Sequence, residues 1–114
     1  MIEAAKEKKA VEITVLELNE VTSFTDHFVI CNGESEPQIR SIFRNIQDKL
    51  QQIGRKVHHM EGSSETGWIL MDYIDFVVHI FSPEKRTYYE LDRLWADAPR
   101  WDVAEEKARK RAIT

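Results

Sequence analysis

The sequence contains little cysteine and glycine and no long apolar run. Cys31 is the only cysteine among 114 residues, which excludes an intrachain disulfide and a cysteine zinc site. The four glycines form neither a G-x-G-x-x-G nor a G-x-x-x-x-G-K-S/T loop, so the two common phosphate-binding motifs are missing. No apolar run approaches the ~20 residues that cross a bilayer, and residues 1–9 lack the apolar stretch of a secretion signal. We therefore expect a cytoplasmic protein with no membrane contact.

Length and composition predict a single domain. Hydrophobic residues make up 42% of the chain and charged residues 32%, which suits a packed core under a solvated surface and argues against disorder of the whole chain. A chain of this length buries about two thirds of its surface on folding, which is enough without disulfides or metal ions. Segment 102–114 has almost nothing to bury. We therefore expect a domain over 1–101, followed by a charged tail over 102–114 that is either helical or mobile.

The two parts of the chain carry opposite net charge. Residues 1–99 contain 11 basic and 17 acidic residues, a net charge of −6, whereas residues 100–114 contain five basic and three acidic residues, a net charge of +2. Tight nucleic-acid binding needs several Lys or Arg side chains on phosphates, and the acidic body supplies few. A basic partner suits it better. An RNA-binding module that uses the basic tail remains an alternative hypothesis.

Hydrophobic periodicity predicts five strands and two main helices. A capping box at 35–38 begins a helix whose apolar stripe extends to the stop at Gly54. A second helix is expected from Ser82 to about Asp97, ahead of Pro99. The expected strands are 11–18, 26–33, 56–60, 68–72 and 75–81, and a short helix is expected over 2–10.

This order of elements predicts a single α/β (α+β) domain built on a mixed sheet of about five strands flanked by helices. The helix between the second and third strands allows one parallel crossover. Segments 68–72 and 75–81 are joined by a short turn, which favours an antiparallel hairpin. Helices are expected to cover at least one face of the sheet.

The histidines and the cysteine do not suggest a metal or nucleophilic site. His58 and His59 are adjacent on an expected strand and point to opposite faces, so they cannot chelate one ion together. His79 lies in an apolar run, where a buried histidine is more common than a metal ligand. Cys31 lies in a hydrophobic strand without an obvious base beside it, as an inert thiol does.

Two aspartates support one enzymatic alternative. Asp72 and Asp75, with the Gly-Ser segment 62–64 upstream, could hold a Mg-nucleotide as in a nucleotidyltransferase. That chemistry usually places its two carboxylates at alternate positions on one strand. Here the spacing is D-x-x-D across a turn, which favours turn-forming aspartates instead.

Aromatic residues gather in the second half of the chain beside carboxylates. On the expected helix, Tyr88, Leu91 and Trp95 occupy positions i, i+3 and i+7 and therefore one face. Trp68 and Tyr73 lie in and next to a strand. Tyr and Trp side chains rimmed by acidic residues are typical hot spots of protein interfaces. The composition thus favours a protein-binding surface in this half.

Several segments together resemble the ribosomal silencing factor (Iojap-related) family. The most specific pattern is W-x-L-x-D-Y, then V-x-H-x-F, then R-x-Y-Y-x-L-x-x-L-W. The matching segments are 25–33, 61–62, 67–73, 77–81 and 86–95.

The resemblance implies a fold related to nucleotidyltransferases but without their activity or cofactors. It implies a protein that binds the large ribosomal subunit through the basic ribosomal protein number fourteen (uL14), with little direct RNA contact. Such a protein blocks joining of the small subunit and represses translation when nutrients are scarce; a homodimer is also implied. The partner-binding residues that the resemblance implies are Trp68, Leu70, Met71, Asp72, Tyr73, Tyr88, Leu91 and Trp95.

Overall fold

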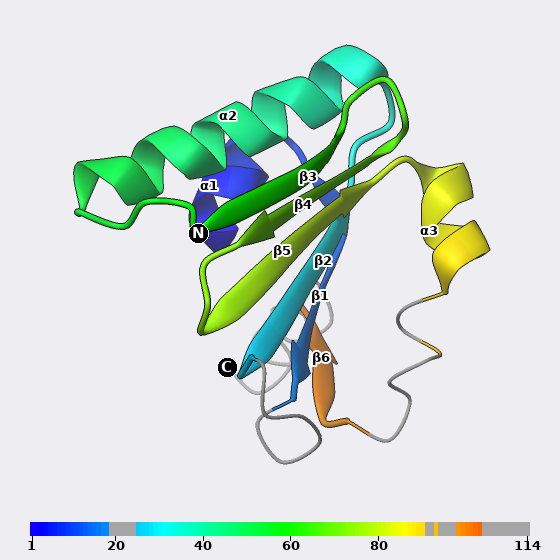
Figure 1. The fold of residues 1–114 in the computed structure, drawn as a ribbon. Coiled ribbons are helices and arrows are strands. Elements are labelled where there is room, and N and C mark those ends of the chain that lie inside the picture. The colour runs from blue at the N-terminus through cyan, green and yellow to red at the C-terminus, as the bar shows by residue number, and fades with distance from the viewer. Residues whose placement is uncertain (19–24, 91–92, 94–97, 104–114) are drawn as a thin grey trace, which may run out of the picture.

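The computed structural model describes residues 1–18, 25–90, 93 and 98–103. Helices α1 and α2 lie on one face of a six-stranded sheet, and helix α3 stands beyond the end of strand β5 (Figure 1). No helix within these residues combines the length and apolarity needed to cross a bilayer. The elements in chain order are α1 (Ile2–Glu7), β1 (Val11–Glu17), β2 (His27–Asn32), α2 (Glu36–Gln52), β3 (His59–Ser63), β4 (Trp68–Asp72), β5 (Phe76–Phe81), α3 (Pro83–Tyr89) and β6 (Arg100–Asp102).

The sheet is mixed, and the predicted fold class is confirmed. Its strand order is β3-β4-β5-β2-β1-β6. Strands β2 and β5 run parallel, with His27 opposite Phe76, while β4 and β5 form the predicted antiparallel hairpin. The other paired strands in the described residues are antiparallel. Helix α2 begins the long connection that returns the chain to β5 parallel to β2.

Two strand predictions need correction. The third strand is β3 at 59–63, not 56–60, because its pairing with β4 runs from His59 opposite Asp72 to Ser63 opposite Trp68. Strand β6 was not predicted at all, since three residues carry no readable period. It pairs with β1 and contains Asp102; of the predicted tail, residues 104–114 lie outside the described residues.

Helix α2 forms where local signals predict it. The Ser35 hydroxyl accepts a hydrogen bond from the Gln38 N–H at 3.2 Å, and Pro37 lies in the first turn. The Gln38 side chain reaches back to the Glu34 N–H at 2.7 Å, one residue before the position that a capping box normally serves. Gly54 follows the helix with φ +83°, a conformation that glycine adopts without steric cost. The four buried residues of the stripe are Ile39, Ile42, Ile46 and Leu50.

The two faces of the sheet bury different clusters. On the helix-covered face, the apolar stripe of α2 packs with α1 and with alternate strand residues such as Ile69, Met71 and Val78. On the opposite face, Phe28, Ile30 and Phe81 belong to a second cluster, against which Trp68 and Leu70 pack while partly exposed. Since strand side chains alternate between faces, neighbouring residues of β4 face either the helices or this second face. The second face is therefore where the aromatic residues of β4 and β5 meet.

Helix α3 is shorter than predicted. It starts at the Ser82 cap, whose hydroxyl accepts from the Lys85 N–H at 3.3 Å, and ends at Tyr89 because Glu90 adopts a left-handed conformation (φ +47°, ψ +45°). The prediction of one continuous helix from Ser82 to Asp97 was wrong at Glu90, which leaves the helical conformation. No glycine stands there to signal the interruption in the sequence. Residues 91–92 and 94–97 lie outside the described residues. None of the side chains of α3 is buried.

Candidate interaction surface

The end of the second sheet face carries a continuous cluster of aromatic rings. Trp68 of β4 lies opposite Phe81 of β5, with ring centroids 6.1 Å apart and nearly parallel. Tyr89 of α3 contacts both, at 5.1 Å from Trp68 and 5.8 Å from Phe81. Tyr88 meets Tyr89 edge-on at 5.1 Å. We call Trp68, Phe81, Tyr88 and Tyr89 the aromatic surface.

The outer members of the aromatic surface are open to solvent. Tyr88 is 76% exposed and Tyr89 41% exposed, whereas Phe81 is buried and Trp68 is half-buried. Tyr89 packs on Trp68 and Phe81, and Tyr88 packs on Tyr89. Rings restricted by such contacts offer a large apolar area at a low cost in conformational entropy. The Lys85 ammonium lies 5.5 Å from the Tyr88 ring centroid and adds a cation–π contact. The cluster therefore has the features of a protein-binding patch.

A hydrogen bond joins His79 to the indole of Trp68. The Trp68 Nε1–H donates to His79 Nδ1 at 3.2 Å, and the two rings are parallel within 5°. Because an indole N–H only donates, this contact places the histidine proton on Nε2, an atom that is buried and without a partner among the described residues. Burial lowers the pKa of His79 to about 4, so the ring is neutral at pH 7. The prediction of a buried histidine is confirmed; its pairing with Trp68 was missed, since it depends on strand register.

The structure places the predicted partner-binding residues of β4 on two different faces. Trp68, Leu70 and Asp72 alternate with residues that face the helices, and all three are partly exposed. Met71 and Tyr73 are 0% and 3% exposed and belong to the core. Both side chains therefore pack inside the protein in this structure, which the sequence does not reveal, because an all-apolar run does not show which alternate positions face outward.

Of the predicted residues on and after α3, the structure describes only Tyr88. Tyr88 is exposed on α3. Leu91 and Trp95 lie outside the described residues, beyond the end of the helix that was expected to align them with Tyr88. Tyr89, which contacts Trp68 directly, was not among the predicted residues, because the helical wheel places it off the Tyr88 stripe.

The two aspartates of the enzymatic alternative take part in structural contacts. Asp72 Oδ1 accepts from the backbone N–H of Ile74 at 2.8 Å, which is a turn contact. Asp75 Oδ1 lies 2.5 Å from Arg55 Nη2. No group of three or more His, Cys, Asp or Glu residues suited to a metal occurs within the described residues.

Gly62 also has a structural explanation. It lies within β3 at φ +81°, and a Cβ there would stand 2.0 Å from the Trp68 carbonyl oxygen. Only a glycine allows this close approach of β3 to β4. The segment 62–64 is thus the end of β3 and the start of a turn, in which the Ser63 N–H donates to the Thr66 hydroxyl at 3.3 Å.

Cys31 should be unreactive in the folded protein. The thiol is fully buried, and burial raises its pKa to about 12, against a smaller lowering by the Arg86 charge. Since the thiolate is the reactive form, an aromatic disulfide reagent at pH 8 should label native protein only as it unfolds, and label protein in guanidinium completely within minutes. Rapid stoichiometric labelling of native protein would contradict the buried position.

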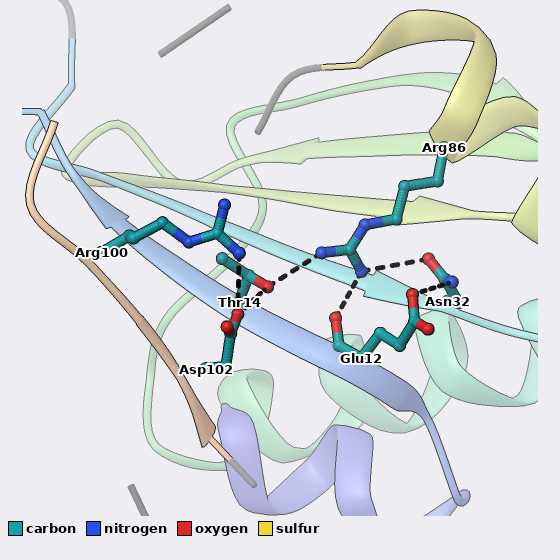
Figure 2. Close-up of polar contacts among 6 residues, drawn as sticks. All are labelled: Glu12, Thr14, Asn32, Arg86, Arg100 and Asp102. Atoms are coloured by element: carbon teal, nitrogen blue, oxygen red, sulfur yellow. Dashed lines mark hydrogen bonds and ion pairs between the residues drawn. The ribbon is translucent and has the colours of Figure 1, made fainter. Parts of the chain in front are cut away.

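A polar network lies beside the aromatic surface. The Arg86 guanidinium extends from α3 to residues of β1 and β2, and Thr14 connects it to Asp102 of β6 (Figure 2). Arg86 begins the R-x-Y-Y pattern in the sequence, but the pattern predicts no role for it, since its partners lie more than fifty residues away.

The fold and the site together define a small α/β protein whose distinctive feature is an exposed aromatic patch at the end of a mixed sheet. The family model described as "Ribosomal silencing factor during starvation" matches residues 1–114. The chain therefore belongs to the RsfS family of ribosomal silencing factors.

Individual relatives agree with this assignment. The ribosomal silencing factor RsfS of Bacillus subtilis is 40% identical over 100 residues, covering 88% of this chain and 85% of the relative. The chloroplastic protein Iojap of Zea mays is 35% identical over 101 residues, covering 86% of this chain and 42% of the maize protein. A crystal structure of a Chromobacterium violaceum protein is 32% identical and superposes with a TM-score of 0.80, covering 83% of this chain and 79% of that one.

Proposed function

We propose that this protein binds the large ribosomal subunit through its aromatic surface, contacts the basic ribosomal protein number fourteen, and thereby blocks joining of the small subunit. The observation that supports this most directly is the exposure of Tyr88 and Tyr89 beside Trp68 in a member of the ribosomal silencing factor family. Fully desolvated aromatic anchors supply most of the binding energy in many protein interfaces.

The charge of the body is consistent with a basic protein partner. Residues 1–99 carry a net charge of −6, so a cationic surface accelerates encounter and favours correct partners over acidic ones. The same charge opposes extensive contact with RNA phosphates, since these also are negative. We therefore propose little direct RNA contact.

The proposed mechanism is steric. Two bodies cannot occupy the same bridge site between the subunits, so occupancy of the large subunit by this protein excludes the small subunit. The degree of repression then depends on the concentration of the factor relative to its Kd and on competition by small subunits. No chemical step is required. We propose that the protein acts this way in the cytoplasm when nutrients are scarce.

The proposal is tested by subunit joining. Light scattering should show slower formation of joined ribosomes when the purified protein is mixed with large subunits before small subunits are added. The effect should decline as small subunits are raised, because the two compete. Unchanged joining at a concentration that saturates the large subunit would refute the steric mechanism.

Salt dependence distinguishes protein contact from RNA contact. Deleting residues 104–114 should leave most of the ribosome affinity in place if the aromatic surface is the contact. A steep salt dependence that disappears with this deletion would instead support the RNA-binding alternative. Light scattering of the protein alone reports whether it forms the homodimer that we propose.

A further inference from the structure

Helix α3 carries two rings of the aromatic surface but has little to hold it in place. It has seven residues and no buried side chain. A helix this short is not stable in isolation, because nucleation costs more than a few hydrogen bonds return. Among the described residues, the Ser82 cap and the ring contacts of Tyr89 hold its two ends, and a further attachment comes from the middle of the helix.

Arg86 supplies that attachment. Its guanidinium donates from Nη1 to the Asn32 side-chain oxygen at 3.2 Å and to the Glu12 carbonyl oxygen, and from Nη2 to the Thr14 hydroxyl at 2.8 Å. Thr14 and Asn32 are 1% and 3% exposed. One rigid fork thus joins α3 to β1 and β2 (Figure 2), and a planar guanidinium can satisfy three acceptors at once where an ammonium acts as a point charge.

The backbone of β1 is shaped to receive this side chain. Its pairing with β2 is irregular between Val11 and Thr14, and Glu12 lies there at φ +50°. A positive φ at a residue other than glycine costs free energy and persists where its surroundings compensate. The carbonyl oxygen of Glu12 accepts from Arg86, and its carboxylate accepts from Asn32 Nδ2 at 3.2 Å.

The same network includes the C-terminal strand. The Thr14 hydroxyl, which accepts from Arg86, donates to Asp102 Oδ1 of β6 at 2.6 Å. Arg100 donates to the same oxygen at 2.9 Å. Burial by itself would raise the pKa of Asp102, but these hydrogen bonds and the two guanidinium charges outweigh it and lower the pKa. Asp102 is thus held as an acceptor, and Thr14 connects β6 to α3.

We infer that Arg86 is the positioning residue of the aromatic surface: it sets α3 so that Tyr88 and Tyr89 stand beside Trp68, and through Thr14 and Asp102 it makes this placement depend on the docking of β6. The effect on partner binding rests on the proposed function. The effect on α3 does not, because it concerns the free protein. Arg86 itself need not touch the partner.

The test compares Arg86→Gln with Arg40→Gln, a matched loss of one positive charge from an exposed i,i+4 pair with Glu36 on α2. Hydrogen exchange of the free protein should accelerate about tenfold or more in the amides of 85–90 in Arg86→Gln, with α2 unchanged. In Arg40→Gln, exchange should match the wild type both in residues 85–90 and in α2. Asp102→Asn should accelerate exchange in 85–90 in the same direction by a smaller factor. Unaltered exchange in 85–90 of Arg86→Gln overturns the inference.

Binding to purified large subunits then distinguishes the positioning role of Arg86 from the effect of its positive charge. Arg86→Gln should weaken binding about tenfold, which loss of a hydrogen bond from a charged group accounts for. Removing a positive charge should by itself favour a basic partner, so this loss would have the wrong sign for a charge effect. In a protein that already carries Tyr88→Ala, Arg86→Gln should lower the affinity for large subunits by less than about twofold, because both changes act on the same contact surface. Full additivity of the two changes would overturn the positioning role.

A second variant and the wild-type binding result keep the role of Arg86 testable separately from the proposed function. Should Arg86→Gln not fold, Arg86→Lys keeps the charge without the three-acceptor fork and should show the same accelerated exchange in 85–90; wild-type exchange in that variant would overturn the inference. Absence of wild-type binding to large subunits would refute the proposed function, while the exchange result would still decide the role of Arg86 in placing α3.

Discussion

Replacing Tyr88 by alanine should weaken binding to the large ribosomal subunit at least about 30-fold, or about 2 kcal/mol, the loss expected for an interface hot spot. Tyr88 is 76% exposed, and its described contacts are the edge-on ring of Tyr89 and the Lys85 ammonium. The free energy of unfolding should therefore change by less than about 0.5 kcal/mol, as for surface substitutions generally. Affinity measured with immobilised large subunits, together with urea unfolding, checks both values.

The control for this prediction is Ile53→Ala. Ile53 is also a large exposed hydrophobic residue, 72% exposed, but it lies at the C-terminal end of α2, away from the aromatic surface. Its replacement should leave affinity unchanged. Wild-type affinity in Tyr88→Ala would show that Tyr88 is not part of the contact with the large subunit. Equal losses of affinity in both variants would indicate a nonspecific apolar contribution.

Acid should destabilise the folded protein through His79, by about 3 kcal/mol between pH 7 and pH 4. Burial lowers the pKa of His79 from 6.5 to about 4 in the folded state. Below pH 6.5 the unfolded chain therefore takes up a proton that the folded chain does not, so stability falls as pH falls. The loss levels off near pH 4, where the folded state is protonated as well. Urea unfolding at several pH values measures this slope.

One variant isolates this contribution. His79→Gln removes the titrating group while its side-chain oxygen can still accept from the Trp68 indole, so the difference from wild type should shrink steadily as the pH is lowered. A slope in His79→Gln equal to that of wild type would show that His79 is not held neutral.

Local sequence signals predicted some elements well, because the interactions that form these elements lie within the elements themselves. The Ser35 cap and the apolar stripe of α2 are read directly from the sequence, since hydrogen bonds and burial follow the helical period. Strands β4 and β5 were placed correctly by their apolar runs and the turn between them. The resemblance rested partly on segments 67–73 and 77–81, which contain β4 and most of β5, and the family assignment is confirmed.

Other features depend on contacts distant in sequence. Strand β6 exists through pairing with β1, with Trp101 opposite Val15, and three residues give no pattern of their own. The inward position of Met71 depends on which face of β4 receives α2. The contact between Trp68 and His79 follows from strand register, and the acceptors of Arg86 lie on strands much earlier in the chain. None of these is encoded in a local period.

The parallel pairing of β2 with β5 has a consequence for synthesis of the chain. Phe76 lies 49 residues after its partner His27, and β5 occupies the position between β2 and β4 in the sheet. During translation the β1–β2 hairpin is made first and exposes an unsatisfied edge until β5 leaves the exit tunnel. Long-range pairing of this kind slows folding and prolongs exposure to aggregation. Because β5 ends at Phe81 in a chain of 114 residues, the central sheet can be completed only after more than two thirds of the chain has been synthesised and β5 has emerged, and β6 is added after it.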